Sequence, residues 1–222
     1  MDQPRNIGVT RVDASRGSPN TAPMADCYLF MAMPSPAERL ALVEALRQAL
    51  AVRGQRLAAP HAFDPANWHQ SLSPKCEGPP ALRTVLRQAG AAAAEQTPAF
   101  TLSFNRLRDA VSSSPASAIH WAFQVRGAAP GFAVLQQRLH EALRARGVAV
   151  PHGNRPHVTV SYRAPGPLVR LPRQHPEMGE VHWRVATVWL VRVRPAIPRY
   201  EAIDAWPLRP APAGPEGQGE LF

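Results

Sequence analysis

The stretch RPHVTVSY, residues 155–162, alternates polar and apolar side chains as a half-buried β-strand does. Successive side chains of a strand point to opposite faces, so one face should carry His157, Thr159 and Ser161. The other face should carry the remaining side chains of the strand: Val158, Val160 and Tyr162. A histidine with a hydroxyl group two residues further on, pointing the same way, indicates an organised polar face.

An earlier stretch, WHQSLSP at residues 68–74, carries a similar pair, His69 and Ser71. Both stretches occupy the same place in an internal repeat, which we infer from pattern and not from identity. The order in each half is a strand, a helix that ends at Arg-Gly, a loop with Pro-His, and the histidine-bearing strand. A chance resemblance between two such segments is the alternative. The repeat predicts two similar lobes related by an approximate two-fold axis.

The elements of the repeat follow from hydrophobic spacing and capping residues. Residues 25–33 and 118–127 are apolar strands that open the two halves. Ser35 and Glu38 form a capping box at the start of the first helix. The expected buried stripes are Val43, Leu46 and Leu50 in the first helix and Leu135, Leu139 and Leu143 in the second. Later strands are predicted at 100–107, 182–193 and 200–208.

If the two lobes face each other, His69 and Ser71 meet His157 and Thr159. Two imidazoles can exchange protons near neutral pH, and two hydroxyl groups can hydrogen-bond phosphate oxygens. This set suits in-line attack at a phosphodiester, with one histidine as base and the other as acid. A cyclic 2′,3′-phosphate is a suitable substrate because its ring bond is strained.

Two other interpretations stay open for these histidines. A single histidine on a strand is more often solvated than catalytic. Paired histidines also bind zinc, although neither stretch contains the Asp, Glu or Cys that usually completes a zinc site. The chain has no GxSxG, GxxxxGK[ST] or GxGxxG motif, so the usual signals of α/β-hydrolases, P-loop enzymes and dinucleotide binding are absent.

The charge of the chain indicates a phosphate-bearing partner. The sequence has 25 Lys+Arg against 16 Asp+Glu, a net charge of +9, and Lys75 is its only lysine. Arginine suits planar, bidentate contacts with phosphate, so a nucleic acid or nucleotide is the expected partner. A GC-rich genome, which enriches Ala, Arg and Pro together, is the alternative explanation.

The cysteines and the N-terminus predict a cytoplasmic protein without a membrane partner. Cys27 and Cys76 have no CxxC or other metal-ligand spacing, so reduced thiols are expected. The chain starts without an apolar signal segment, and no run approaches the roughly 18 apolar residues of a membrane span.

We expect one domain at residues 25–208, flanked by disordered tails. Its first lobe should cover about 25–110 and its second about 118–208, with exchange of strands between them left open. Residues 1–24 and 209–222 are rich in Pro, Gly, Ser and Ala and show no periodicity.

The last five residues, QGELF, resemble the Gln-x-x-Leu-Phe peptide by which bacterial proteins dock on the DNA sliding clamp. Gln218, Leu221 and Phe222 are the residues that would make this contact. An unstructured terminus is the alternative.

The two motifs resemble the twin His-x-Ser/Thr motifs of the 2H phosphoesterase superfamily. The likeness is greatest to the bacterial 2′-5′ RNA ligase family, whose members act as RNA 2′,3′-cyclic phosphodiesterases, and it covers residues 25–208. It implies an α/β (α+β) fold with two pseudo-symmetric lobes, each a mainly antiparallel sheet with helices, around a V-shaped cleft. It also implies no metal, no cofactor, and RNA ends or cyclic-phosphate nucleotides as partners.

By this resemblance, His69 and His157 are catalytic, while Ser71 and Thr159 hold the non-bridging oxygens of the phosphate. The second histidine of the family is usually cast as the base, which assigns His157 as base and His69 as acid. The expected reaction opens a terminal 2′,3′-cyclic phosphate of RNA to a 2′-phosphate without a metal. Reversible 2′-5′ ligation of RNA ends is a second reaction that the same groups can catalyse.

The chain departs from the family at two positions where many members carry arginine. Tyr28 stands on the first strand, and Tyr162, followed by Arg163, stands after the second motif. An absent arginine weakens stabilisation of the transition state, and Arg163 can replace it only if the strand contains a bulge. Tyr28, Tyr162, Arg163 and Trp68 are therefore candidate substrate contacts, with core packing as the alternative for the aromatic residues.

These departures keep a second function open. A protein that binds RNA ends or nucleotides in the same cleft without catalysis is the main alternative. Within the enzyme class, a small cyclic nucleotide or a 2′,5′-linked oligonucleotide is an alternative substrate.

Overall fold

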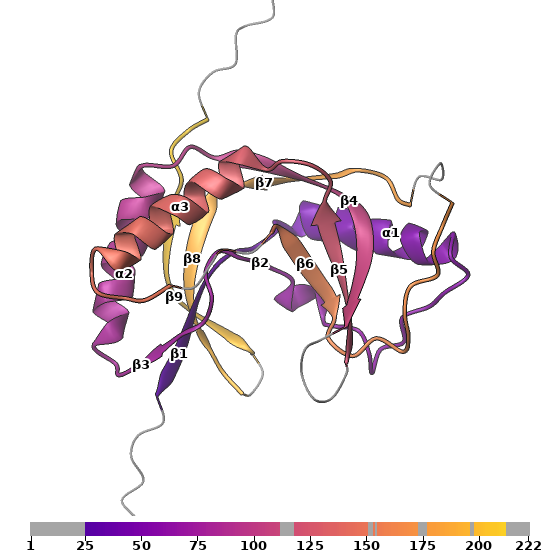
Figure 1. Cartoon of the computed structure of the whole chain (residues 1–222), viewed down its shortest axis with the longest axis horizontal. Helices are drawn as coiled ribbons and strands as arrows, with labels where there is room; N and C mark the ends of the chain where they lie inside the picture. Colours follow the sequence, from indigo (N-terminus) through magenta and orange to yellow (C-terminus); the bar gives the residue numbers. More distant parts are fainter. Residues whose placement is uncertain are drawn as a thin grey trace, which may run out of the picture.

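The computed structural model of the chain describes residues 25–111, 118–150, 153, 155–172, 177–195 and 198–211. Two antiparallel sheets lean away from each other like the arms of a V (Figure 1). The expected α+β fold with two sheet-containing lobes is confirmed. The candidate clamp-binding residues lie outside the described residues: Gln218, Leu221 and Phe222.

The first sheet has the strand order β2-β1-β8-β9, and β3 also pairs with β1. Its strands are β1 (Asp26–Ala32), β2 (Gln70–Ser71), β3 (Cys76–Gly78), β8 (Thr187–Val193) and β9 (Tyr200–Pro207). The second sheet has the order β6-β5-β4-β7. Its strands are β4 (Phe100–Val111), β5 (Ile119–Val125), β6 (His157–Ser161) and β7 (Val181–Val185). Each sheet therefore combines strands from both halves of the chain, so strands are exchanged between the halves.

The segment 182–193, predicted as one strand, forms parts of two strands in different sheets. β7 ends at Val185 and β8 begins at Thr187. Between them, the carbonyl of Ala186 accepts a hydrogen bond from the Leu208 backbone N–H at 2.8 Å. The prediction of one strand was wrong because it overlooked a change of phase: the buried positions are odd-numbered in β7 and mainly even-numbered at the start of β8.

The helices are α1 (Pro36–Ala51), α2 (Leu82–Glu95) and α3 (Pro130–Arg144). The capping box of α1 is confirmed, since Ser35 and Glu38 exchange both hydrogen bonds. Gly54 follows α1 with φ 62°, and Gly147 follows α3 with φ 77°, the left-handed conformation that suits glycine at a helix end.

The buried stripe of α3 is as predicted, but that of α1 is rotated. Leu135, Leu139 and Leu143 of α3 are fully buried. In α1 the prediction is confirmed for Leu50, whereas Leu46 is only partly buried and Val43 is 39% exposed. The other buried residues of α1 are Leu42, Ala45 and Ala49. Alanine carries little weight in a hydrophobic pattern, so the sequence favoured the larger residues on the neighbouring face.

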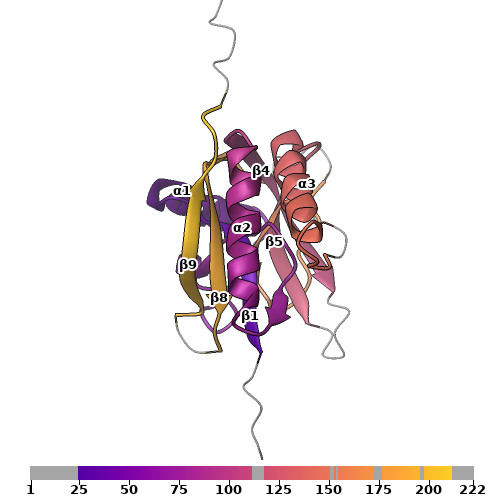
Figure 2. The same ribbon diagram turned by 90° about the vertical axis from the view of Figure 1, so that its left-hand side faces the viewer.

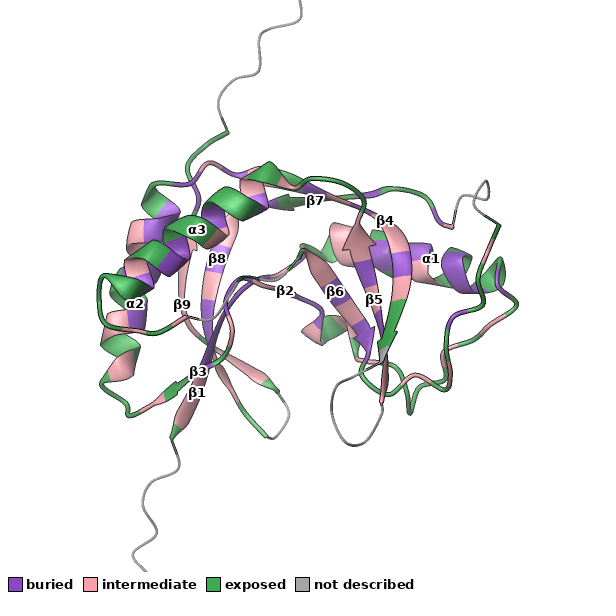
Figure 3. Cartoon of the chain, in the orientation of Figure 1, coloured by how far each residue is buried: buried purple, intermediate pink, exposed green. Residues whose placement is uncertain are grey.

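Helix α2 has no counterpart in the sequence-based prediction. Its buried face consists mainly of small residues: Leu86, Ala89, Gly90, Ala93 and Ala94. It packs on β8 and β9 and lies beside α3 (Figure 2). Burial is concentrated on the sides of the helices that face the sheets (Figure 3). The small side chains of α2 allow this close approach.

We predict that Gly90→Ala destabilises the protein. A Cβ atom at Gly90 would overlap the ring of Trp206 and would lie 2.8 Å from Phe30. Overpacking costs about 1–3 kcal/mol, which exceeds the gain of about 1 kcal/mol in helix propensity. Urea denaturation should therefore show a lower free energy of unfolding. Gly166→Ala, at a position with open space around it, is the control; an equal effect of the two substitutions would contradict the packing account.

Candidate functional site

The two histidine motifs lie on strands at the edges of the two sheets, and these strands are in contact. β2 ends the first sheet and β6 ends the second. The fully buried side chain of Gln70 joins them. Its Oε1 accepts a hydrogen bond from the His157 backbone N–H at 2.6 Å, and its Nε2 donates one to the Ser71 carbonyl at 2.7 Å. One amide therefore ties the backbone of the first motif to that of the second.

Both imidazoles are oriented in the same way. Nδ1 of His69 lies 2.8 Å from the carbonyl oxygen of Asn67, and Nδ1 of His157 lies 2.9 Å from that of Arg155. A carbonyl only accepts hydrogen bonds, so each Nδ1 carries a proton. Nε2 is then the nitrogen that takes up a proton in the neutral ring and gives one up in the charged ring.

The environment of His69 favours its neutral form. Its side chain is largely buried, and this burial is the main cause that lowers the pKa of the imidazole. The hydrogen bond to the Asn67 carbonyl acts in the opposite direction, while the charges of His157 and Arg199 lower the pKa further. His157 and Arg199 are therefore within electrostatic reach of His69.

Tyr200, at the start of β9, packs against His69. The two ring centroids are 4.9 Å apart and the rings meet edge to face at 71°. Burial raises the pKa of Tyr200 to about 12, with a further contribution from Tyr162, while Arg199 acts in the opposite direction. Tyr162 follows β6 in the other sheet, so the electrostatic environment of Tyr200 includes a residue of each sheet.

The two predicted phosphate-binding hydroxyl groups also belong to this site. Ser71 pairs with Met31 across β2 and β1, and Thr159 lies on β6 two residues after His157. Both side chains are half-buried. Among the described residues, neither hydroxyl has a hydrogen-bond partner. The site therefore combines two imidazoles with two hydroxyl groups.

The strand 157–161 contains a bulge that changes the predicted faces. Trp121 pairs with Ser161 and Ala122 with Thr159, which leaves Val160 without a partner in this ladder. Ser161 is consequently fully buried, and its hydroxyl donates to the His61 carbonyl at 2.6 Å. The prediction that Ser161 shares the face of His157 and Thr159 was wrong.

The same bulge decides the positions of Tyr162 and Arg163. The ring of Tyr162 is 39% exposed, packs on His120 with centroids 5.3 Å apart, and influences Tyr200 electrostatically. It therefore lies on the side of the histidine site. Arg163 is exposed, and its carbonyl accepts a hydrogen bond from Nδ1 of His61 at 2.8 Å.

Tyr28 and Trp68, also expected as candidate contacts, are core residues. Each is 2% exposed. Tyr28 donates a hydrogen bond to Asp26 at 2.9 Å, on the face of β1 opposite Met31. Trp68 donates to the carbonyl of Phe63 at 2.8 Å and packs on Phe123. We therefore correct these two expectations and leave both residues out of the proposed site.

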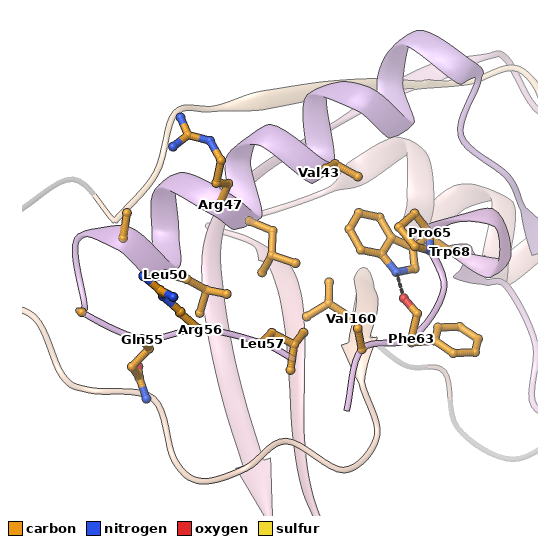
Figure 4. Close-up of a pocket in the computed structure, with 14 residues that line it drawn as sticks. Val43, Arg47, Leu50, Gln55, Arg56, Leu57, Phe63, Pro65, Trp68 and Val160 are labelled. Carbon is orange, nitrogen blue, oxygen red and sulfur yellow. Dashed lines mark hydrogen bonds between the residues drawn. The ribbon is translucent and has the colours of Figure 1, made fainter. Parts of the chain in front are cut away.

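Trp68 instead borders an apolar cavity of about 770 Å³ between α1 and β6 (Figure 4). Val160 lines this cavity from the strand, and Val43 and Leu46 line it from the helix. The alternation of β6 places Val160 opposite Thr159, so the cavity lies behind the histidine-bearing face.

An apolar surface of the first sheet adjoins the histidines. Leu29, Met31 and Val191 form a cluster with partly buried residues around it: Met33, Trp189, Val193 and Tyr200. Ser71 pairs with Met31 and so shares this face. We call it the inner face of the first sheet. It offers flat and flexible apolar groups beside the catalytic candidates.

Sequence reasoning missed Gln70, Tyr200 and Arg199 as residues of this site. Gln70 occupies the variable position between His69 and Ser71, and its role depends on a strand that is distant in sequence. Tyr200 was assigned only to a strand. The sole signal in the sequence for Arg199 is its place just before a strand in an arginine-rich chain.

Over the described ranges, no group of three or more His, Cys, Asp and Glu side chains could hold a metal ion together. None of the helices in the described part of the chain combines the length and apolar character needed to cross a membrane.

The fold occurs in proteins of known structure. E. coli LigT matches with a TM-score of 0.61 and 19% identity, over 83% of this chain and 98% of LigT. TT0787 of Thermus thermophilus matches with a TM-score of 0.59 and 22% identity, over 83% of this chain and 98% of its own. LigT in complex with 3′-AMP matches with a TM-score of 0.60 and 17% identity, over 83% and 98% of the two chains.

These matches establish the fold: the chain has a LigT-like architecture with two antiparallel sheets. Sequence comparison adds nothing to this, since no family model and no curated protein matches the chain significantly. LigT has been crystallised with ATP, 3′-AMP and NADP+.

We predict that Gln70→Met lowers the free energy of unfolding by about 1–3 kcal/mol, because the buried N–H of His157 loses its acceptor. Urea denaturation at pH 7 measures this change. Gln137→Met is the matched control, since Gln137 is exposed on α3 and bonds only to Glu141 there. Equal losses in the two variants would show that Gln70 does not bridge the motifs.

We also predict that His69 titrates below the usual histidine pKa of about 6.5. NMR of the imidazole protons measures this value directly. The unfolded chain binds the proton at higher pH than the folded chain, so stability present above about pH 6.5 is lost as the pH falls. His69→Asn should reduce this loss. Part of the loss should remain in this variant, because burial also lowers the pKa of His140. A normal titration of His69 contradicts the burial argument.

Proposed function

We propose that this protein is a metal-independent cyclic phosphodiesterase that opens the terminal 2′,3′-cyclic phosphate of RNA to a 2′-phosphate. The observation that carries the proposal is the pairing of His69 and His157 through Gln70, with both Nδ1 atoms bound to carbonyls. Two Nε2 atoms and two hydroxyl groups are then available to one phosphate. Acid-base catalysis at a phosphodiester needs one proton acceptor and one proton donor, which two Nε2 atoms can supply.

In the proposed reaction, a water oxygen attacks phosphorus while Nε2 of one histidine takes the proton of the water. The bond from phosphorus to the 3′-oxygen breaks, and Nε2–H of the other histidine protonates that oxygen. The products are a 2′-phosphate and a 3′-hydroxyl group. Ser71 and Thr159 donate hydrogen bonds to the non-bridging oxygens, where negative charge increases in the transition state. With a 5′-hydroxyl group in place of water, the same displacement forms a 2′-5′ bond.

The lowered pKa of His69 supports an assignment of roles that reverses the expected one. A base must be neutral before the reaction, and burial favours the neutral form of His69. We therefore propose His69 as the base and His157, which is half-buried on β6, as the acid. The reverse assignment, with His157 as base, follows only from the resemblance.

The surroundings of the histidines suit a nucleotide. Arg199 is close enough to His69 to lower its pKa, and it supplies a positive charge to a site in which Tyr162 supplies none. Tyr162 and the inner face of the first sheet, with Trp189, offer aromatic surfaces for a base. The crystal structure of LigT, which has the same fold, in complex with 3′-AMP supports a nucleotide ligand for this chain.

A protein that binds RNA ends without catalysis is the second candidate. The observation in its favour is the absence of arginine at position 162, because a site with less positive charge stabilises the transition state less. The orientation of both imidazoles favours the enzyme, since binding alone does not require two available Nε2 atoms.

An end-group assay on a short RNA with a 2′,3′-cyclic phosphate, in the presence of EDTA, tests the proposal. The natural protein should form a 2′-phosphate, and His69→Ala or His157→Ala should each lower kcat at least about 100-fold, the lower range for general acid-base catalysis. His182→Ala, at an exposed histidine, is the control. RNA binding without ring opening would overturn the enzyme and support the second candidate.

The same variants assign the roles. A substrate with sulfur in place of the 3′-oxygen has a leaving group that needs no acid. This substrate should restore activity to His157→Ala and not to His69→Ala. Restoration of His69→Ala alone would reverse the two roles.

A further inference from the structure

A second cavity, which is polar, lies along the part of β4 that β7 does not pair with. It has a volume of about 810 Å³, and β4 lines it from Asn105 to Asp109. β7 pairs with β4 only from Phe100 to Phe104, so the remaining edge faces the segment 168–172 and residues 177–178 instead of a strand. The cavity has no part in the proposed reaction.

Positive charge dominates this cavity. Five arginines line it against two carboxylates: Arg53, Arg106, Arg108, Arg126 and Arg170 against Asp109 and Glu177. Glu177 is shared between Arg53, at 3.2 Å, and Arg108, at 2.6 Å. Asp109 accepts a hydrogen bond from the Leu168 backbone N–H at 2.9 Å.

Three of the five guanidinium groups have no carboxylate partner within the described residues: Arg106, Arg126 and Arg170. Arg126 and Arg170 are exposed, and Arg106 is half-buried. A cluster of uncompensated arginines repels itself unless an anion neutralises it. Arg53 and Arg108, by contrast, both form ion pairs with Glu177.

The register of the second sheet connects this cavity to the histidine site. Arg106 pairs with Gln124 on β5, and Gln124 pairs with His157 on β6. Arg108, Ala122 and Thr159 form the neighbouring row. Directly paired residues of antiparallel strands point to the same face, so Arg106 and His157 share a face at about 10 Å, two strand spacings.

We propose that this arginine cavity binds the phosphate backbone of a single-stranded RNA whose 3′ end lies at the histidines. The inference rests on the proposed function and defines its substrate as an oligonucleotide in preference to a mononucleotide. Guanidinium groups bind phosphates through paired hydrogen bonds. The row of residues from His157 to Arg106 begins where the reacting phosphate would bind, so the arginines lie where the next phosphates of an RNA strand could follow. An acidic peptide fits the charge but gives no reason for this alignment with His157.

Binding to an unreactive RNA tests the cavity independently of catalysis. The probe is a fluorescent octanucleotide with a 2′-phosphate end, measured by anisotropy, and the corresponding nucleoside 2′-phosphate is measured by calorimetry. The test variant replaces Arg106, Arg126 and Arg170 with Gln. The matched control replaces three exposed arginines of α2 and the α3 region, Arg83, Arg138 and Arg146, and so removes the same charge.

The test variant should weaken octanucleotide binding by at least about tenfold and reduce the slope of log K against log salt by up to about 2, or about 0.7 for each lost contact with a single-strand phosphate. Its affinity for the mononucleotide and the affinity of the control variant for RNA should stay within about twofold. Equal losses in the two variants, or equal losses for both ligands, overturn the inference. Tighter binding of polyglutamate than of RNA, with the same arginine dependence, overturns it in favour of an acidic protein. If the natural protein binds RNA through these arginines but does not open the cyclic phosphate, only the proposed reaction is rejected.

Discussion

The hydrogen bonds of the Gln70 amide are the constraint on which the candidate site depends. β2 and β6 belong to different sheets, so no ladder of backbone hydrogen bonds fixes their relative position. The buried amide supplies this connection, because one end accepts from His157 and the other donates within the first motif. Burial strengthens its effect, since an unpaired amide in that place is costly. The distance between the two imidazoles is thereby set by a side chain between them.

The inner face of the first sheet and the histidine-bearing face of the second sheet, which flank this connection, differ in character. The first sheet presents an apolar surface with Met31 and Trp189, while the second presents polar rows that run from His157 and Thr159 toward the arginines of β4. A nucleotide has the same two characters, an aromatic base and a charged backbone. The arrangement thus separates the surface suited to the base from the surface suited to the phosphates, with the histidines at their junction.

Much of this arrangement could be predicted from the sequence. The twin motifs, the capping box of α1 and the leucine stripe of α3 follow from local rules that operate within a few residues. The errors arose where distant contacts decide. The bulge at Val160 removes Ser161 from the polar face, and α2 is buried through alanine and glycine, which give a weak hydrophobic pattern. The role of Gln70 depends on a partner 87 positions away.

A crystal structure with bound adenosine 2′-phosphate, the product-like ligand, tests the central claim most directly. The account predicts one phosphate group in hydrogen-bond contact with Nε2 of both His69 and His157, and with the hydroxyl groups of Ser71 and Thr159. A phosphate that contacts only one of the two imidazoles, or that binds away from both, would contradict a site in which two histidines act on one phosphorus atom.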